Sequence, residues 1–117
     1  MSKAYNPSHS IGMNARTELL KEVKDANSTI KCADLEDVYF ASDTKGKRFL
    51  LKENYSDEDL RRFYEEIDFE YDSGYGSEEL DGIVWFNDGT WLERGEYDGS
   101  EWWEHKKLPE IPNYLSK

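Results

Sequence analysis

The sequence predicts an α+β fold, with a single antiparallel sheet of about five strands and two helices packed on one face. The first observation is a pair of turns at 87–89 and 98–99, where Asp-Gly separates segments rich in β-branched and aromatic residues. The second is that residues 15–26 and 57–67 place apolar side chains at helical spacing. Helices segregated from hairpin-linked strands are typical of the α+β class.

Both helices have recognisable starting residues. Asn14 and Ser56 are suitable N-caps, because their side chains can accept hydrogen bonds from the free backbone N–H groups of a first turn. Asp59 adds a capping box to the second helix. The expected buried faces consist of Leu19, Leu20 and Val23 in the first helix and Leu60, Phe63, Tyr64 and Ile67 in the second.

The strands are predicted from β-prone segments bounded by turns. A short strand at 29–33 precedes a hairpin of 38–41 and 48–51, with Gly46 at the left-handed position of its loop. A three-stranded C-terminal meander covers 81–87, 90–97 and 100–105. Two prolines keep the following tail extended, and we expect Leu108 and Ile111 to pack across the domain edge.

Length and composition indicate one domain over 14–117, preceded by a flexible arm over 1–13. Cys32 is the only cysteine, which excludes an internal disulfide, and we expect it in the core. There is no signal peptide pattern and no apolar segment long enough to span a membrane. We therefore expect a cytoplasmic protein.

The acidic charge is concentrated in one part of the chain. The net charge is −11, but residues 53–104 contain 18 acidic residues against three arginines, a net of −15. Such asymmetry repels nucleic acids and acidic membranes and attracts basic partners. We therefore expect a basic protein partner, without direct nucleic-acid or membrane binding.

The acidic loop expected over 68–79 partly matches the spacing of a calcium-binding loop. Ser73 replaces the glycine that permits the sharp turn, and a strand rather than a helix is predicted to follow, so we favour a solvated loop. We expect no catalytic residue, cofactor or bound metal, because no spacing of histidine, cysteine or serine indicates an enzyme. The weak metal candidates are Asp68, Glu70, Asp72 and Glu79.

The four tryptophans all lie in the C-terminal meander. Trp102 and Trp103 must point to opposite faces of a regular strand, and we expect Trp85 and one of this pair to lie in the core. The outer aromatic side chains would form a patch ringed by carboxylates. The predicted partner-binding residues are Trp91, Glu93, Glu96, Tyr97, Asp98, Glu101, Trp102, Trp103 and Glu104.

The segments YDSGYG (71–76) and IVWFNDGTWLERGEYDGSEWWE (83–104) resemble small uncharacterised proteins of tailed bacteriophages. The likeness covers roughly residues 68–112 and carries over no catalytic residue. It implies expression in a bacterial cytoplasm and a role in host takeover or counter-defence.

These observations predict a small acidic protein that is not an enzyme and that binds and inhibits a host protein through a Trp-rich β surface. Nucleic-acid mimicry is the sharper form of this hypothesis, because carboxylates around aromatic groups complement a surface that binds phosphates and bases. The main alternative is a protein-interaction or assembly module without mimicry, and the third is a small hydrolase or calcium-binding protein. Apolar residues on both faces of the sheet also leave a homodimer open.

Overall fold

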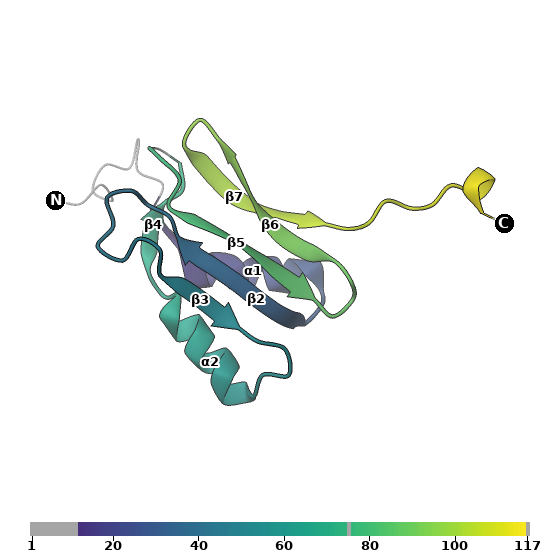
Figure 1. Cartoon of the computed structure of the whole chain (residues 1–117), viewed down its shortest axis with the longest axis horizontal. Helices are drawn as coiled ribbons and strands as arrows, with labels where there is room; N and C mark the ends of the chain where they lie inside the picture. Colours follow the sequence, from purple (N-terminus) through teal and green to yellow (C-terminus); the bar gives the residue numbers. More distant parts are fainter. Residues whose placement is uncertain (1–11, 75, 117) are drawn as a thin grey trace.

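The computed structural model describes residues 12–74 and 76–116. Its main layer is a five-stranded antiparallel sheet in the order β3-β2-β5-β6-β7 (Figure 1). These strands are β2 (Ile30–Asp37), β3 (Arg48–Leu51), β5 (Leu80–Phe86), β6 (Trp91–Tyr97) and β7 (Ser100–Lys106). A small second sheet pairs β1 (Gly12–Asn14) with β4 (Glu70–Asp72). The predicted α+β class, the five-stranded sheet and the C-terminal meander are confirmed.

The two helices begin at the predicted caps. In α1 (Ala15–Ala26), the Asn14 side chain accepts a hydrogen bond of 2.9 Å from the backbone N–H of Thr17. In α2 (Asp57–Glu66), Ser56 and Asp59 form the expected capping box. Local sequence therefore fixes where each helix starts.

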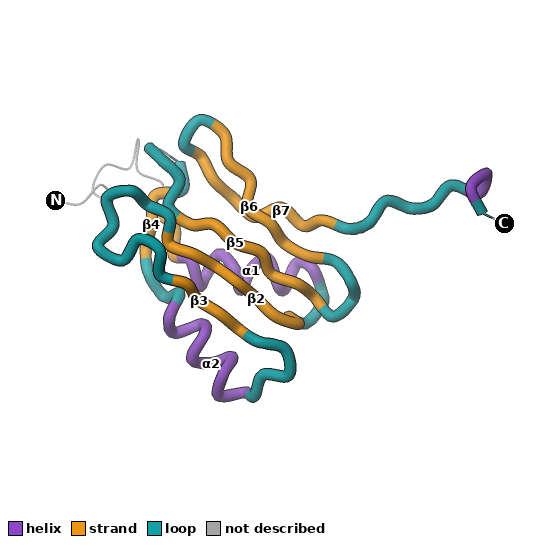
Figure 2. The backbone as a smooth tube through the Cα atoms, in the orientation of Figure 1, coloured by secondary structure: helices purple, strands orange, loops and turns teal. Residues whose placement is uncertain are grey.

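Residues of both helices pack into one apolar cluster on the same face of the sheet. Figure 2 shows α1 behind the sheet and α2 along its edge strand β3. Leu19 of α1 and Phe63 of α2 belong to one apolar cluster with the strand residues Leu35, Val84 and Leu92. Alternate strand residues point away from this cluster. Among the described elements, no helix lies on that other side, which we call the uncovered face.

Strand β2 differs from the prediction. A short strand at 29–33 and another at 38–41 were expected, but one continuous strand runs from Ile30 to Asp37 and residues 38–47 form a loop. Asp37 ends the strand, because its carboxylate accepts hydrogen bonds from the Tyr39 backbone N–H and the Ser42 hydroxyl. The expected pairing of 38–41 with 48–51 is therefore wrong, and β3 pairs with Ala33–Glu36 instead.

Two segments expected to be irregular form the small sheet. Residues 70–72, predicted within the acidic loop, form β4 because Tyr71 turns into the core with 3% of its surface exposed. Gly12 and Met13, predicted at the end of the flexible arm, form β1 against it. Residues 1–11 of that arm lie outside the described residues.

The chain after β7 extends away from the sheet and ends in a short 3₁₀ turn at Asn113–Leu115 (Figure 1). Leu108 and Ile111, expected to pack on the domain, are 75% and 73% exposed. Pro109 and Pro112 keep this segment extended beyond the end of the sheet, so it does not fold back. None of the described helices is both long and apolar enough to span a bilayer.

Candidate functional site on the uncovered face

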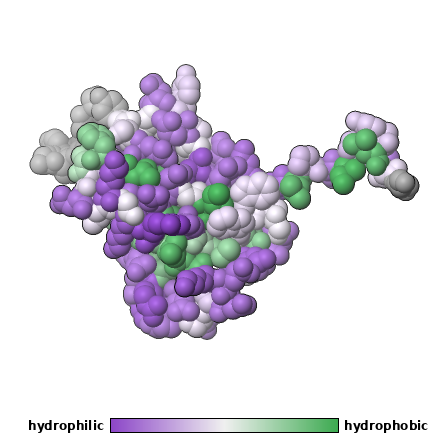
Figure 3. Space-filling view, viewed as in Figure 1, coloured by the Kyte–Doolittle hydropathy of each residue, from purple (hydrophilic) through white to green (hydrophobic). Residues whose placement is uncertain are grey.

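Three of the four tryptophans lie on the uncovered face. Trp85 of β5 is paired across the strands with Trp91 of β6, and Trp102 of β7 is paired with Gly95 of β6. Trp85 and Trp102 are 39% and 37% exposed, and Trp91 is half-buried. Figure 3 views this face and shows hydrophobic side chains over the centre of the sheet with hydrophilic ones around them.

Trp102 is held flat over its neighbouring strand. A Cβ atom added at Gly95 would lie 2.6 Å from Nε1 and 2.7 Å from Cε2 of Trp102, so the indole occupies the space that a larger residue would need. The indole N–H donates a 2.9 Å hydrogen bond to Oε2 of Glu104. This bond, followed by the contact with Lys106, lowers the pKa of Glu104. Trp102 and Glu104 are thus ordered before any partner arrives.

Carboxylates separate the aromatic groups. Glu93 and Glu104 are cross-strand partners, and they lie between the Trp85–Trp91 pair and Trp102. From Trp91 to Gly95 the separation along β6 is about 13 Å at about 3.3 Å per residue. Three more acidic residues lie on the same face, Asp34 and Glu36 in β2 and Asp81 in β5.

Two basic residues on this face neutralise part of its charge. Arg48 pairs with Asp34, and Lys106 lies 3.3 Å from Glu104 and 4.0 Å from Glu93. Counted over Asp34, Glu36, Asp81, Glu93 and Glu104 against these two bases, three negative charges remain. Exposed ion pairs of this kind are worth about 0–1 kcal/mol, so a partner can replace them at low cost.

The predicted partner-binding residues divide between the two sides of the sheet. The expected opposed directions of Trp102 and Trp103 are confirmed by the strand register. Trp91, Glu93, Tyr97, Trp102 and Glu104 lie on the uncovered face, whereas Glu96, Glu101 and Trp103 point to the side of the helices and Asp98 lies in the β6–β7 turn.

Two of these assignments are wrong because the side chains are inaccessible. Trp103 and Glu101 are 6% and 3% exposed, so neither belongs to a surface patch. Trp85 was expected in the core and is instead one of the exposed tryptophans. Cys32, also expected in the core, is half-buried on the uncovered face opposite Trp85.

Glu101 and Trp103 are buried by a charged network around Arg94. The Arg94 side chain is 1% exposed, and its Nη2 donates hydrogen bonds to Oε1 of Glu101 at 2.7 Å and to the Tyr71 hydroxyl at 2.8 Å. Its guanidinium lies 4.8 Å from the centre of the Trp103 ring. Tyr71 in turn donates to Glu18 of α1. Sequence reasoning missed this network, because an arginine in a strand usually indicates a solvated position.

Most polar atoms of this network are paired within it, which indicates a structural role, although Nη1 of Arg94, 3.6 Å from Oε1 of Glu18, and Nε1 of Trp103 make no hydrogen bond to the described residues. Oε2 and Oε1 of Glu101 accept hydrogen bonds from the backbone N–H groups of Glu79 and Leu80 at 2.8 and 3.1 Å. Burial raises the pKa of Glu18, and the Tyr71 hydroxyl and Arg94 oppose that rise. The single guanidinium of Arg94 therefore interacts with both carboxylates, Glu18 and Glu101, and the network joins α1, β4, β6 and β7.

The four weak metal candidates do not form one cluster. Asp68 and Glu70 both accept hydrogen bonds from Nδ2 of Asn14, at 2.9 and 3.3 Å. Asp72 is buried and accepts one from the Gly74 backbone N–H, and Glu79 lies just before β5. Within 12–74 and 76–116, no group of three histidine, cysteine or acidic residues could hold a metal ion. The calcium-loop spacing considered for 68–79 is thus interrupted by a strand.

The chain has no match among family models, curated proteins or solved structures with which it was compared.

Proposed function

We propose that this chain is a non-enzymatic binding protein that attaches to a basic protein partner through the uncovered face of its sheet. The observation that carries the proposal is the presence of Trp85, Trp91 and Trp102 on a sheet face that no described helix covers. Tryptophan is enriched at binding hot spots because it buries a large rigid area at low entropic cost. The net negative charge of the face favours a partner rich in lysine and arginine.

The resemblance to bacteriophage proteins extends this proposal to a host protein that is inhibited by binding. In its sharper form the partner is a nucleic-acid enzyme, and the face imitates its substrate. The row of Glu93 and Glu104 between aromatic groups supports this form, because nucleic-acid sites combine cations for phosphates with apolar surfaces for bases.

A non-mimetic interaction module is the second candidate. Arg48 and Lys106 already pair with Asp34, Glu93 and Glu104, which weakens the field available for steering a partner. Association would then depend mainly on tryptophan burial.

The test is a pull-down from bacterial lysate with three proteins: the native chain, Trp85→Ala/Trp102→Ala, and the control Tyr114→Ala. Tyr114 is an exposed aromatic residue of the C-terminal tail, 83% exposed. Loss of one hot-spot tryptophan costs about 2 kcal/mol or more, so we expect the double variant to lose at least about 30-fold in affinity for any specific partner. Equal retention by all three proteins would refute the role of the face.

Salt separates the two candidates. Between about 0.1 M and about 1 M salt the screening length falls from about 10 Å to about 3 Å. A nucleic-acid enzyme retained only at low salt, and lost with Glu93→Lys but not with Glu110→Lys, would support mimicry. A partner retained at high salt would support the interaction module. A dimer of the chain that dissociates in the tryptophan variant would show that the face binds a second copy, which would overturn the proposal of a basic partner.

A further inference from the structure

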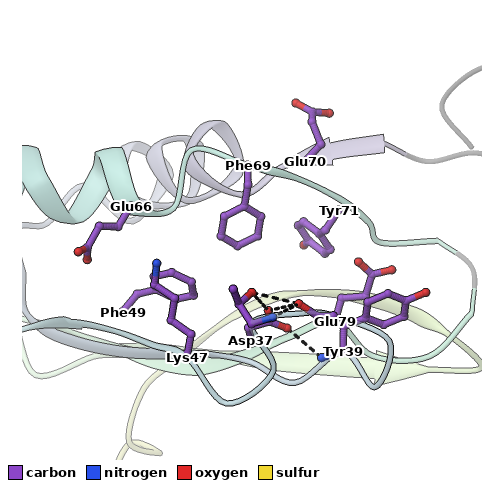
Figure 4. Close-up of a pocket in the computed structure, with 11 residues that line it drawn as sticks. Asp37, Tyr39, Lys47, Phe49, Glu66, Phe69, Glu70, Tyr71 and Glu79 are labelled. Carbon is purple, nitrogen blue, oxygen red and sulfur yellow. Dashed lines mark hydrogen bonds between the residues drawn. The ribbon is translucent and has the colours of Figure 1, made fainter. Parts of the chain in front are cut away.

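A recess lies on the helix side of the sheet, between the loop 38–47 and the segment that joins α2 to β4 (Figure 4). It has a volume of about 340 Å³. Four aromatic side chains from three separate segments of the chain line it, namely Tyr39, Phe49, Phe69 and Tyr71. We call this recess the aromatic pocket.

Acidic groups surround the aromatic walls. Glu66 stands at one end of the aromatic pocket and Glu79 at the other, whereas the carboxylate of Glu70 points away (Figure 4). Asp37 forms part of the wall. Lys47 is the one basic residue among the lining side chains of the described chain. The pocket therefore has a negative potential over apolar surfaces.

Asp37 gives the pocket a fixed edge. Its carboxylate accepts hydrogen bonds from the Ser42 and Thr44 hydroxyls at 2.6 and 2.7 Å, and from the Tyr39 backbone N–H at 3.1 Å. Burial alone would raise the pKa of Asp37, but these hydrogen bonds lower it. Asp37 thus remains charged and holds the loop in place, with its oxygens already occupied.

The carboxylate of Glu66, unlike that of Asp37, is not held by hydrogen bonds from the described part of the chain. Glu66 is the last residue of α2, where a negative charge opposes the helix dipole, and the described residues offer it no ion-pair or hydrogen-bond partner. Its neighbour Glu65, by contrast, pairs with Arg61. The position of Glu66 is therefore unfavourable for the isolated helix but suited to a cation in the pocket.

The chain itself already places a cation against the aromatic wall. Nζ of Lys47 lies 5.4 Å from the centre of the Phe49 ring, within the range of a cation–π contact. The Phe49 and Phe69 rings lie 5.7 Å apart, so this wall continues into the pocket. A small metal ion does not fit this arrangement, because no three ligating side chains of the described chain converge.

We propose that the aromatic pocket binds an organic cation with an apolar stem, namely a guanidinium or alkylammonium group, either free or on a side chain of a bound peptide. The stem lies against Phe49, Phe69 and Tyr71, and the charge is balanced by Glu66. This site is independent of the tryptophans on the uncovered face, so either proposal can fail without the other.

The probes are N-acetyl-Gly-Arg-Gly amide, the same peptide with citrulline in place of arginine, and agmatine. Citrulline has the shape of arginine without its charge. Ligand-detected and amide-detected NMR would follow the titration, and we expect a dissociation constant of about 1 mM or lower. Ring currents should shift the arginine methylene protons upfield, and the amides of 37–49 and 66–71 should move. Binding of the peptide alone would identify a side chain as the ligand, and binding of agmatine alone a free amine; either supports the site.

Matched variants test the geometry. Glu66→Gln should weaken binding by about threefold or more, whereas Glu110→Gln in the tail should leave it unchanged. Lys47→Gln should strengthen binding by about twofold to fivefold, because it removes a competing cation from the Phe49 ring. Lys45→Gln is the control for Lys47→Gln, because it changes the net charge of the same loop equally while Lys45 is not part of the pocket lining. Equal binding of the citrulline peptide, equal effects of the two lysine variants, or no shift at millimolar probe would each overturn the proposal.

Discussion

Replacing Glu101 with glutamine should destabilise the fold severely, although the change removes only a charge. Oε1 of Glu101 accepts hydrogen bonds from Leu80 N–H and from Arg94, and Oε2 accepts one from Glu79 N–H. A glutamine amide in either orientation would direct an NH₂ group at a donor. The guanidinium of Arg94 would also lose its nearest counter-charge in a site where its side chain is 1% exposed.

The size of the effect follows from burial. Removing one partner of a buried ion pair costs about 3–5 kcal/mol. For a domain of this size, that loss corresponds to a decrease of roughly 10–20 °C in Tm. Glu104→Gln is the control, because Glu104 lies on the uncovered face and its exposed contact with Lys106 is worth about 0–1 kcal/mol.

Urea unfolding followed by circular dichroism would measure both variants. Combining Glu101→Gln with Arg94→Met should cost less than the two single changes together by about 1 kcal/mol or more, because the second change removes a charge that has already lost its partner. If Glu101→Gln lost no more than Glu104→Gln, or if the two losses were simply additive, the assignment of Arg94 and Glu101 as an energetically coupled buried pair would be wrong.

Three further changes test local features. Ser56→Ala removes the cap of α2 and should lower the free energy of unfolding by about 1 kcal/mol, measured by urea titration. Gly95→Ala should displace the Trp102 indole, since the new Cβ would lie 2.6 Å from Nε1 of Trp102. A changed tryptophan emission spectrum and a pKa of Glu104 closer to its ordinary value would verify the displacement. The pKa of Asp37 is held below its ordinary value of 3.8, so the stabilising contribution of the Asp37 carboxylate is complete above pH 3.8. This contribution disappears as the pH falls through the pKa of the folded state. Asp37→Asn should therefore reduce the slope of the unfolding free energy against pH in that acidic range.

The features that the sequence predicts correctly are those set by neighbouring residues. Asn14 and Ser56 cap the helices through bonds to residues three positions ahead, and the turns at 87–89 and 98–99 need only their own residues. The pairing of β1 with β4 joins residues more than 50 positions apart, so no local sequence pattern predicts this pairing.

The sequence does not indicate which face of the sheet the helices cover. Strand alternation places Trp85 on one face and Val84 and Phe86 on the other, but both sets are apolar, so hydrophobicity does not indicate which set the helices cover. Asp34 and Glu36 interrupt the apolar pattern of β2, because they are the residues of this strand that point to the uncovered face. The full length of β2 is therefore not evident from hydrophobicity. A stronger signal was the turn at 87–89, which brings Trp85 opposite Trp91 and keeps the two on one face.

The extended tail after β7 has a hydrodynamic consequence. The molecule measures 61 × 35 × 24 Å and has a radius of gyration of 16.2 Å. A compact chain of 117 residues is expected at about 13 Å. The monomer should therefore elute from a sizing column earlier than globular standards of its 13.8 kDa mass, at a position easily read as a dimer. Sedimentation equilibrium or light scattering, which report mass independently of shape, is the appropriate measurement of its oligomeric state.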